Sequence, residues 1–540
     1  MNPDRDTTTA THAPGHAPGH AAEPAGDEVR ERADVLVIGT GFAGLGTATR
    51  LKRQGRHSFV VLERADDVGG TWRDNTYPGA ACDVPSHLYS FSFRPNPDWS
   101  RLFARGPEIH QYLRDTARDE GLLPHIRFGA EVTHARWDAA QQHWVVTTTR
   151  GVFVSRFLVT GTGHLSDHSL PDIPGLDGFD GPVFHSARWD HSTQLAGKRV
   201  AVVGSGASAV QIVPEVAEVA AEVVVLQRSA PYVVPRPDLA YTDSEKRVFR
   251  RDPEAVPAHR AEIFWYLEAG YAARRAAPHQ LAEAKSAARS HLERQITDPD
   301  LRAALTPDYE LGCKRVLISD TYYPALSRDH VRLEASALAR VEQRTVLAAS
   351  GARHSVDAIV LCTGFETAEP PYAHLVHDGD GTSLAEHWAQ GMEAFASTTV
   401  AGFPNLFIVN GPNTGLGHNS IVHIIEAQID YLLGAMEWSR RHGDHTVEVS
   451  AAAQQQYTDE LGRRGAGSVW TSQGCKSWYT DPRSGRLTLI WPDFADEFRH
   501  RNGTFDPAPY LPPATAHRRA DAGGSPARPD ATDATLIDVL

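Results

Sequence analysis

Two copies of one local pattern constrain the fold of this chain more than any other feature of its sequence. Each copy has a short apolar stretch, a glycine-rich turn and a segment suited to a helix; residues 34–54 read DVLVIGTGFAGLGTATRLKRQ, and residues 199–213 read RVAVVGSGASAVQIV. A second apolar stretch follows each copy, FVVLE in the first and EVVVL in the second. A strand, a glycine turn, a helix and a second strand form the unit of parallel α/β sheets that bind dinucleotides. The sequence therefore predicts an α/β protein with two Rossmann-like dinucleotide-binding domains.

Length and composition narrow the class of protein further. At 540 residues the chain is too long for one ordinary hydrophobic core, so we expect several domains. The net charge is −14, and no basic stripe marks a surface for nucleic acid. No apolar run reaches the roughly 20 residues of a membrane-spanning helix, and the polar N-terminus lacks the apolar segment of a signal peptide. These features favour a cytoplasmic, multidomain enzyme.

The four cysteines stand far apart in the sequence, at Cys82, Cys313, Cys362 and Cys475. No two of them form a CxxC pair, so the sequence predicts neither a disulfide framework nor a zinc site, and no other metal site is expected. Such cysteine usage is typical of a reducing compartment. It also argues against a flavin disulfide reductase, which requires a redox-active cysteine pair.

The first glycine turn has the context that a dinucleotide site requires. Gly39, Gly41 and Gly44 follow an apolar strand and open a helix, so the backbone can turn tightly and present free N–H groups to a pyrophosphate. Glu63 ends the next strand, where a carboxylate accepts hydrogen bonds from ribose hydroxyls.

The second turn, Gly204, Gly206 and Ala209, differs at the ribose position. Gln227 stands where the first unit has a carboxylate, and Arg228 follows it. Arginine pairs with a 2′-phosphate, which a carboxylate would repel, so we expect NADPH here. The alternative is that Arg228 is an ordinary surface arginine. Two sites of opposite preference indicate a bound FAD and an exchanging NADPH, with hydride passing from the nicotinamide to the flavin; without a cysteine pair, the oxidant is a quinone-type acceptor or O₂.

Changes in composition divide the chain. The segments at both ends lack enough apolar residues to pack, and in the first of them we favour a flexible tail over a metal-binding tract at His12, His16 and His20. Strand patterns return after a charged helical stretch, so the simplest account is one domain interrupted by another. The expected boundaries are an N-terminal tail 1–32, the FAD-binding domain 33–165, a linker 166–195, the NADPH-binding domain 196–345 with a helical insert 242–308, the second part of the FAD-binding domain 346–511, and a C-terminal tail 512–540.

Two further segments carry a family resemblance. GGTWRDNTYPGAACD (69–83) and FDGPVFHSARWD (179–190) resemble the paired fingerprints of the type I Baeyer–Villiger monooxygenases. The matching residues are Gly69, Gly70, Trp72, Tyr77, Pro78, Gly79 and Asp83 in the first, and Phe179, Gly181, His185, Trp189 and Asp190 in the second. The resemblance implies an FAD- and NADPH-dependent enzyme that converts a small-molecule ketone and O₂ into an ester or lactone through a C4a-peroxyflavin.

The resemblance also implies residue roles. Arg315 would stand over the flavin and stabilise anionic intermediates, and Asp83 would position it. Lys314 and Arg228 would grip the 2′-phosphate, and Trp478 would contact the nicotinamide half. The FAD would be lined by Trp72, Tyr89 and Val132. The remaining positions expected at the cofactors are Phe42, Ala43, Arg64, Gly70 and Thr71 for FAD, and Ser205, Ala207, Ser208 and Ser229 for NADPH.

Several alternatives stay open. Asp83 could be a helix cap or turn residue, Arg315 a structural ion pair and Trp478 plain core. For His185 we favour a conformational role between the domains over proton transfer, with a buried core histidine as the other alternative. For the whole protein, the alternatives are an N- or S-oxygenating flavin monooxygenase, which usually has Tyr at the position of Trp189, and a cofactor-binding redox sensor without catalysis. The natural ketone and the oligomeric state are left open.

Overall fold

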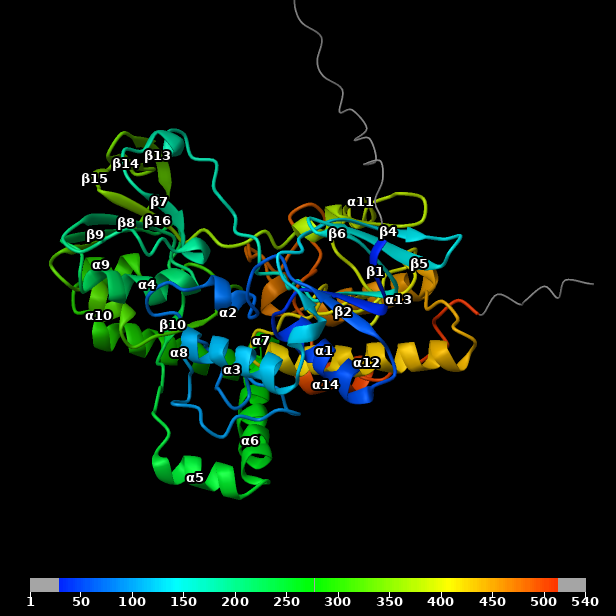
Figure 1. Cartoon of the computed structure of the whole chain (residues 1–540). Coiled ribbons are helices and arrows are strands. Elements are labelled where there is room, and N and C mark those ends of the chain that lie inside the picture. Colours follow the sequence, from blue (N-terminus) through cyan, green and yellow to red (C-terminus); the bar gives the residue numbers. More distant parts are fainter. Residues whose placement is uncertain (1–28, 276, 513–540) are drawn as a thin grey trace, which may run out of the picture.

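The computed structural model describes residues 29–275 and 277–512. It consists of two α/β units side by side, with a group of helices that extends away from both (Figure 1). The predicted tails fall almost wholly outside the described residues, and so do His12, His16 and His20. The first strand begins at Val29, so residues 29–32 belong to the sheet and not to the tail in which the sequence placed them.

The first unit is built on an eight-stranded sheet. Its strand order is β17-β4-β5-β6-β1-β2-β3, with β18 paired to β6. The central strands β6, β1, β2 and β18 run parallel, and their apolar sequences leave them buried on both faces. The strands are β1 (Val29–Ile38), β2 (Phe59–Leu62), β3 (Ile126–Arg127), β4 (Val132–Asp138), β5 (His143–Thr148), β6 (Gly151–Thr160), β17 (Val376–His377) and β18 (Leu406–Ile408).

Helices cover this sheet and come from distant parts of the sequence. The helix after the first glycine turn, α1 (Phe42–Gln54), packs on the long helix α12 (Ile421–Arg441). Gly46 allows the contact, since a Cβ atom there would lie 3.0 Å from Cδ1 of Ile429. The other helices of the unit are α2 (Thr71–Asp74), α3 (Gly106–Asp119), α11 (Leu384–His387), α13 (Ala451–Gly465) and α14 (Ala495–Asn502).

The second unit has a five-stranded, wholly parallel sheet in the order β12-β9-β8-β16-β7. An antiparallel sheet of β13, β14 and β15 and a two-stranded pair of β10 and β11 complete it. The strands are β7 (Val183–His185), β8 (Arg199–Val203), β9 (Glu222–Leu226), β10 (Val233–Val234), β11 (Leu317–Ile318), β12 (Val331–Glu334), β13 (Leu338–Glu342), β14 (Thr345–Ala348), β15 (Arg353–Ser355) and β16 (Ala358–Leu361). Its sheet is packed by α4 (Ala207–Ala217) and α10 (Tyr322–Leu326).

The sheet pairing corrects two predicted boundaries. Strand β7 lies within the predicted linker 166–195, yet it pairs with β16. Strand β16 lies beyond residue 345, where the second domain was expected to end, yet it pairs with β8. The physical reason is that a short buried parallel strand carries no sequence mark of the sheet it joins. The chain therefore crosses between the units in residues 161–175 and 362–375.

These two crossing segments run side by side. The Ser169 N–H donates to the Gly364 carbonyl at 2.9 Å, and the Glu366 N–H donates to the Asp167 carbonyl at 2.9 Å. The Thr363 hydroxyl donates to the Ser169 carbonyl at 2.6 Å. The two crossing segments thus hydrogen-bond to each other, so they join the units as one paired connection and not as two independent linkers.

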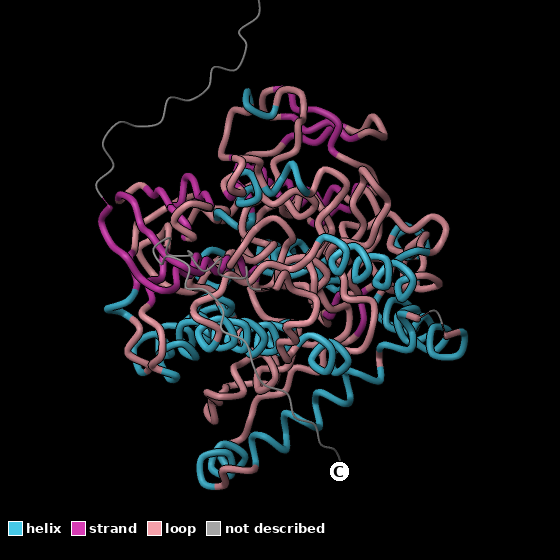
Figure 2. The backbone as a smooth tube through the Cα atoms, turned by 90° about the vertical axis from the view of Figure 1, so that its right-hand side faces the viewer, coloured by secondary structure: helices cyan, strands magenta, loops and turns pink. Residues whose placement is uncertain are grey.

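The segment predicted as a helical insert forms helices and has no strand among its described residues. They are α5 (Asp243–Arg251), α6 (Ala255–Ala269), α7 (Tyr271–Arg274), α8 (Pro278–Gln295) and α9 (Pro299–Ala304). Thr242 and Glu245 form a capping box that starts α5. In the view turned by 90°, long helices run along the lower side of the molecule and most strands lie above them (Figure 2). None of the described helices is long and apolar enough to cross a membrane.

Candidate active site

The first glycine turn opens into a cavity. Gly39 and Gly41, the strand end at Glu63 and the segment that begins at Gly70 all line it. A Cβ atom at Gly39 would lie 2.7 Å from the carbonyl oxygen of Gly161, and helix α1 has no side-chain cap at its first residue. Its free N–H groups therefore suit a pyrophosphate. The predicted FAD residues found in the cavity lining are Gly39, Gly41, Phe42, Ala43, Glu63, Arg64, Gly70, Thr71, Trp72, Tyr89 and Val132.

Two predicted FAD residues lie behind this lining. Gly44 packs helix against strand, since a Cβ atom there would come within 1.8 Å of the Gly39 carbonyl oxygen. Asp83 is not among the lining residues; it lies beside Arg315. The fit of these residues to a dinucleotide therefore rests on the turn, the free helix terminus and the aromatic wall, in which the Trp72 indole N–H donates to the Tyr89 hydroxyl at 3.3 Å.

Glu63 is more strongly bound by the protein than its sequence position suggested. One carboxylate oxygen accepts from the Thr40 N–H at 3.0 Å and from the Thr40 hydroxyl at 2.5 Å. The other accepts from the Ala65 N–H at 2.9 Å and pairs with Arg73 at 2.9 Å. Glu63 is only 4% exposed. A ribose hydroxyl that binds Glu63 must therefore replace one of these donors.

The second glycine turn is open to solvent. A Cβ atom at Gly206 would meet nothing within 4 Å, and helix α4 again lacks a side-chain cap. Gln227, which occupies the position of Glu63, is buried and donates to the Ala304 carbonyl at 2.9 Å, so its amide points into the protein. Arg228 is exposed, and it forms no ion pair with any described residue. The turn residues Ser205, Gly206, Ala207 and Ser208 are partly or fully exposed, and Ala209 is buried.

Lys314 and Ser229 meet at this second turn. The Lys314 ammonium donates to the Ser229 hydroxyl at 2.8 Å, and the Ser205 hydroxyl donates to the Ser229 carbonyl at 2.8 Å. Burial and the nearby Arg228 cation lower the pKa of Lys314. Arg228, Ser229 and Lys314 thus form a cationic, hydrogen-bonding group that matches a phosphate.

Asp83 and Arg315 are brought together from distant parts of the chain. The Arg315 Nε atom donates to Oδ2 of Asp83 at 2.7 Å, and Nη1 donates to the Leu416 carbonyl at 3.4 Å. Burial alone would raise the pKa of Asp83, but the Arg315 charge outweighs it and holds that pKa below its ordinary value. Asp83 in turn raises the pKa of Arg315. The pair is fully ionised, and each side chain keeps about a third of its surface accessible (32% for Arg315, 28% for Asp83).

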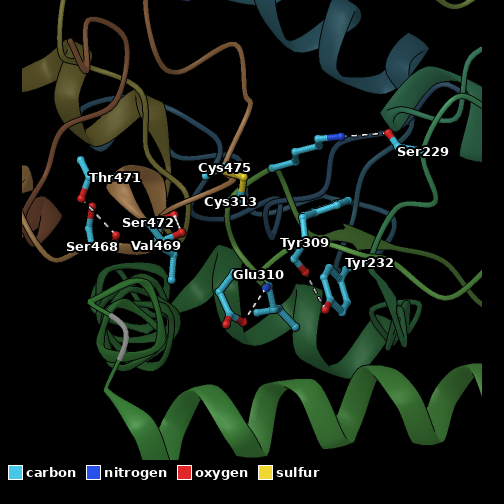
Figure 3. The surroundings of a disulfide bond; sticks show 12 residues. Ser229, Tyr232, Tyr309, Glu310, Cys313, Ser468, Val469, Thr471, Ser472 and Cys475 are labelled. Atoms are coloured by element: carbon cyan, nitrogen blue, oxygen red, sulfur yellow. Dashed lines mark hydrogen bonds between the residues drawn. A yellow bond between two sulfur atoms is a disulfide. The ribbon is translucent and has the colours of Figure 1, made fainter. Parts of the chain in front are cut away.

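A disulfide that the sequence did not predict lies next to this pair. Cys313 is bonded to Cys475, so the segment of Lys314 and Arg315 is tied to the loop that carries Trp478 (Figure 3). The prediction of no disulfide was wrong because the two cysteines are 162 residues apart and only the fold brings them together. The cysteines therefore do not support a reducing compartment. Cys82 and Cys362 are free and buried.

Trp478 lies at the surface of this loop and is not plain core. It is 38% exposed, and its ring packs against Tyr479 at 4.6 Å between centroids. The His164 ring, on the first crossing segment, lies 6.3 Å from it. Trp478 therefore faces the region where the crossing segment leaves the first sheet.

The first fingerprint docks on helix α4 of the second unit. Oε1 of Gln211 accepts from the Tyr77 hydroxyl at 3.0 Å, and the Gln211 amide donates to the Ala81 carbonyl at 3.0 Å. A Cβ atom at Gly79 would lie 2.6 Å from the Gln211 carbonyl oxygen. Gly79 is thus required by the close approach of the two units, and Gln211 is a contact that sequence reasoning missed.

The second fingerprint lies against both crossing segments. His185 ends β7, and its ring packs on His168 of one segment at 5.0 Å and on Phe365 of the other at 5.9 Å. The ring accepts from the Ala187 N–H at 3.1 Å, and burial lowers the pKa of His185 to about 4. Trp189 packs edge-on against Phe184 at 5.0 Å.

The other fingerprint residues support this arrangement. Phe179 is buried, and a Cβ atom at Gly181 would lie 2.7 Å from both the Asp357 carbonyl oxygen and the Phe179 ring. Asp190 accepts hydrogen bonds from the Ser192 N–H and hydroxyl and from the Thr193 hydroxyl. The second fingerprint is therefore a structural turn at the joint between the units.

Sequence reasoning also missed Arg274 and Tyr479. Arg274 belongs to the helical segment, which no motif connected with the site, yet it interacts electrostatically with Arg315. Tyr479 interacts with both arginines and is buried. The signal for Tyr479 was its position beside Trp478; Arg274 had none.

Known proteins resemble this chain over most of its length. Residues 32–243 match the model of the FMO-like family, flavin-binding monooxygenase-like proteins. A protein of Streptomyces coelicolor named Baeyer–Villiger monooxygenase is 46% identical, covering 92% of this chain and 96% of its own length. A protein of Pseudomonas aeruginosa with the same name is 43% identical over 88% of this chain and 90% of its own. The solved structure of a protein called OTEMO in complex with FAD and NADP has a TM-score of 0.78 at 27% identity, covering 87% of this chain and 97% of that one.

Proposed function

Since the chain belongs to the Baeyer–Villiger monooxygenases, we propose that Asp83 and Arg315 are the catalytic pair of its oxygenation reaction. The enzyme is an FAD- and NADPH-dependent monooxygenase: a ketone, O₂, NADPH and a proton give an ester or lactone, water and NADP⁺. The observation that carries the residue assignment is the 2.7 Å contact between Nε of Arg315 and Oδ2 of Asp83, in a pair that stays accessible.

The first turn is the proposed FAD site. The lining residues and the uncapped N-terminus of α1 fit a dinucleotide. When bound, FAD would accept hydride from NADPH and activate O₂. Trp72 and Tyr89 form an aromatic wall of the cavity, and Glu63 binds the ribose after one of its present donors gives way.

Arg315 acts on charge at the reacting carbonyl. When the carbonyl carbon is attacked, negative charge develops on oxygen, and a fixed guanidinium stabilises it without rearranging. Arginine suits this role because it stays charged at every working pH. Asp83 accepts from Nε, so the terminal nitrogens remain directed to other oxygens, such as the Leu416 carbonyl. Asp83 also offsets the cost of placing the cation in this partly buried site.

The second turn is the proposed NADPH site. Arg228, Lys314 and Ser229 provide a cation pair and a hydroxyl for the 2′-phosphate, and Gln227 turns away from it. Trp478 is proposed to contact the nicotinamide half. His185 is proposed to act on the relative placement of the units, because it packs on both crossing segments and is neutral when buried.

The test replaces Arg315 with Ala and follows two half-reactions. Removal of a preorganised cation is expected to lower ester formation from a ketone by at least about 100-fold. Anaerobic reduction of bound FAD by NADPH should persist, since Arg315 is not needed to hold FAD. The rate of ester formation by the Asp83→Asn variant should lie between those of the wild type and the Arg315→Ala variant. Ketone conversion by Arg315→Ala at the wild-type rate would show that the catalytic assignment is wrong.

A further inference from the structure

Arg274 is a second arginine at the site, and the function proposed above leaves it without a role. It ends helix α7 of the helical segment. Its Nη1 atom donates to the Gly270 carbonyl at 3.0 Å, and its Nη2 atom donates to the Gly417 carbonyl at 2.8 Å. The stem passes between two glycines, since Cβ atoms at Gly312 and Gly417 would both lie 3.8 Å from its Cγ atom. The side chain is therefore held in place by backbone on both sides.

No carboxylate accompanies this cation. Among the residues that the structure describes, Arg274 forms no ion pair, whereas Arg315 has Asp83. Burial first, and then the Arg315 charge, lower the pKa of Arg274 to about 10. A guanidinium removed from water without an anion is unfavourable, so its two carbonyl partners leave the charge uncompensated.

The two arginines hold one loop. Arg315 donates to the Leu416 carbonyl and Arg274 to the Gly417 carbonyl, which are consecutive in the chain. Asp83 neutralises one of the two charges only. Arg274, Arg315 and Asp83 together therefore carry a net charge of +1, and the unpaired charge lies on Arg274, beside the proposed catalytic pair.

One further donor near these arginines lacks an acceptor. The Trp470 indole N–H is buried and has no hydrogen-bond partner among the described residues. The Trp470 ring lies against Gly417, where a Cβ atom would be 3.4 Å from its Cζ2 atom. The Tyr479 side chain interacts electrostatically with both arginines and is placed to hydrogen-bond with Arg315. A buried donor without an acceptor is uncommon in folded proteins, and the Trp470 N–H therefore points to a group that is supplied from outside.

We propose that Arg274 binds a carboxylate carried by the ketone substrate, so that oxo acids are the preferred substrate class; this rests on the function proposed for Arg315. A carboxylate has up to four acceptor positions and suits the free N–H groups of a guanidinium. Arg315, already paired with Asp83, is left for the carbonyl. The two arginines then fix the two ends of one substrate, with a spacer of a few carbon atoms.

The experiment compares each oxo acid with its own methyl ester, since the two differ mainly in charge. Laevulinate and its longer homologues are suitable probes. The wild type should prefer acid to ester in kcat/KM by at least about tenfold, the range of a charge-assisted hydrogen bond. Arg274→Met and Arg274→Gln should lower this ratio by about 10- to 100-fold, and Arg274→Lys should restore part of it.

The matched control is Arg275→Met, which removes an exposed arginine from the next position. It should leave the acid-to-ester ratio at the wild-type value. FAD content and melting temperature of each variant establish that it is folded, and because the readout is a ratio, a general loss of activity does not imitate the effect.

Three results would overturn the proposal. One is a wild type that shows no preference for the acid; another is an Arg274→Met variant in which acid and ester fall in parallel. The third is an unchanged ratio with a raised KM for NADPH, which would assign Arg274 to the cofactor. If neutral ketones and esters are oxidised without preference for the acid, this inference fails while the proposed function stands. If no ketone is oxidised by the wild type, the proposed function itself fails.

Discussion

The two glycine turns have nearly the same backbone and opposite surroundings. At the first, Glu63 is buried and bound by Thr40, Ala65 and Arg73. At the second, Gln227 points into the protein and Arg228 is left exposed beside Lys314. The strand–turn–helix unit therefore suits a pyrophosphate in both places, and we propose that the residues after the second strand decide which ribose each accepts. The first turn opens into an enclosed cavity and the second is exposed to solvent, which fits the proposed bound FAD and exchanging NADPH.

The largest expected effect concerns the third position of the turns. Gly44→Ala would place Cβ 1.8 Å from the Gly39 carbonyl oxygen, so we expect a loss of about 3 kcal/mol or more and loss of FAD. The second turn already has Ala209 there, and Ala209→Gly should cost about 1 kcal/mol. Thermal unfolding and the FAD-to-protein absorbance ratio measure both. Normal FAD content in a Gly44→Ala variant would show that the first turn does not require glycine at its third position.

The disulfide ties the second turn's Lys314 segment to the first unit, so its removal tests whether the units depend on fixed placement. Cys313→Ser and Cys475→Ser should each lower stability by about 2–5 kcal/mol, because the bond closes a long loop. Calorimetry of oxidised and reduced protein gives the value, and the double variant, which should not respond to reductant, is the control. Equal melting temperatures in all samples would contradict a stabilising bond.

Removal of the Arg228 charge at the second turn is expected to have a smaller effect, and only on the binding of NADPH. Arg228→Gln should raise KM for NADPH by about 10- to 100-fold and leave that for NADH nearly unchanged, since only NADPH has the 2′-phosphate. Steady-state kinetics with both cofactors measure it. Arg332→Gln removes another exposed arginine of the same sheet and serves as the control. An equal effect on NADH would mean that Arg228 does not read the phosphate.

The smallest expected effect is a pH dependence at the same turn. Because burial and Arg228 lower the pKa of Lys314, its charge is lost at a lower pH than that of an ordinary lysine. KM for NADPH should therefore rise a few-fold, roughly, as the pH increases through that lowered pKa, and stay low below it. Lys314→Arg should abolish the rise, since arginine does not titrate there. A rise of the same size in Lys314→Arg would assign it to another group.

The sequence predicted the features that depend on residues close together in the chain. Both turns follow from glycine spacing and strand composition, and most residues predicted for FAD line one cavity. The fingerprints predicted which segments matter, and the structure gives the reason: Gly79 permits the approach of α4, and His185 touches both crossing segments.

Long-range partners could not be predicted in this way. The sheet that β7 and β16 join is decided by pairing across the fold, and neither strand carries a distinguishing residue. The disulfide and the position of Arg274 beside Arg315 depend on the path of the helical segment. Glu63 was predicted as an acid at a strand end, but its burial and its four protein donors became known only from packing.

The disulfide has a kinematic consequence for the two units. The hydrogen-bonded crossing segments attach one unit to the other at one place, and the bond between Cys313 and Cys475 attaches them at a second. A second covalent attachment removes relative motions of two bodies that one attachment would allow. While the bond is intact, a covalent link limits how far the Lys314 segment and the Trp478 loop can move apart; when it is reduced, only non-covalent contacts, such as those of Gln211 with the first fingerprint, hold the units together away from the crossing segments.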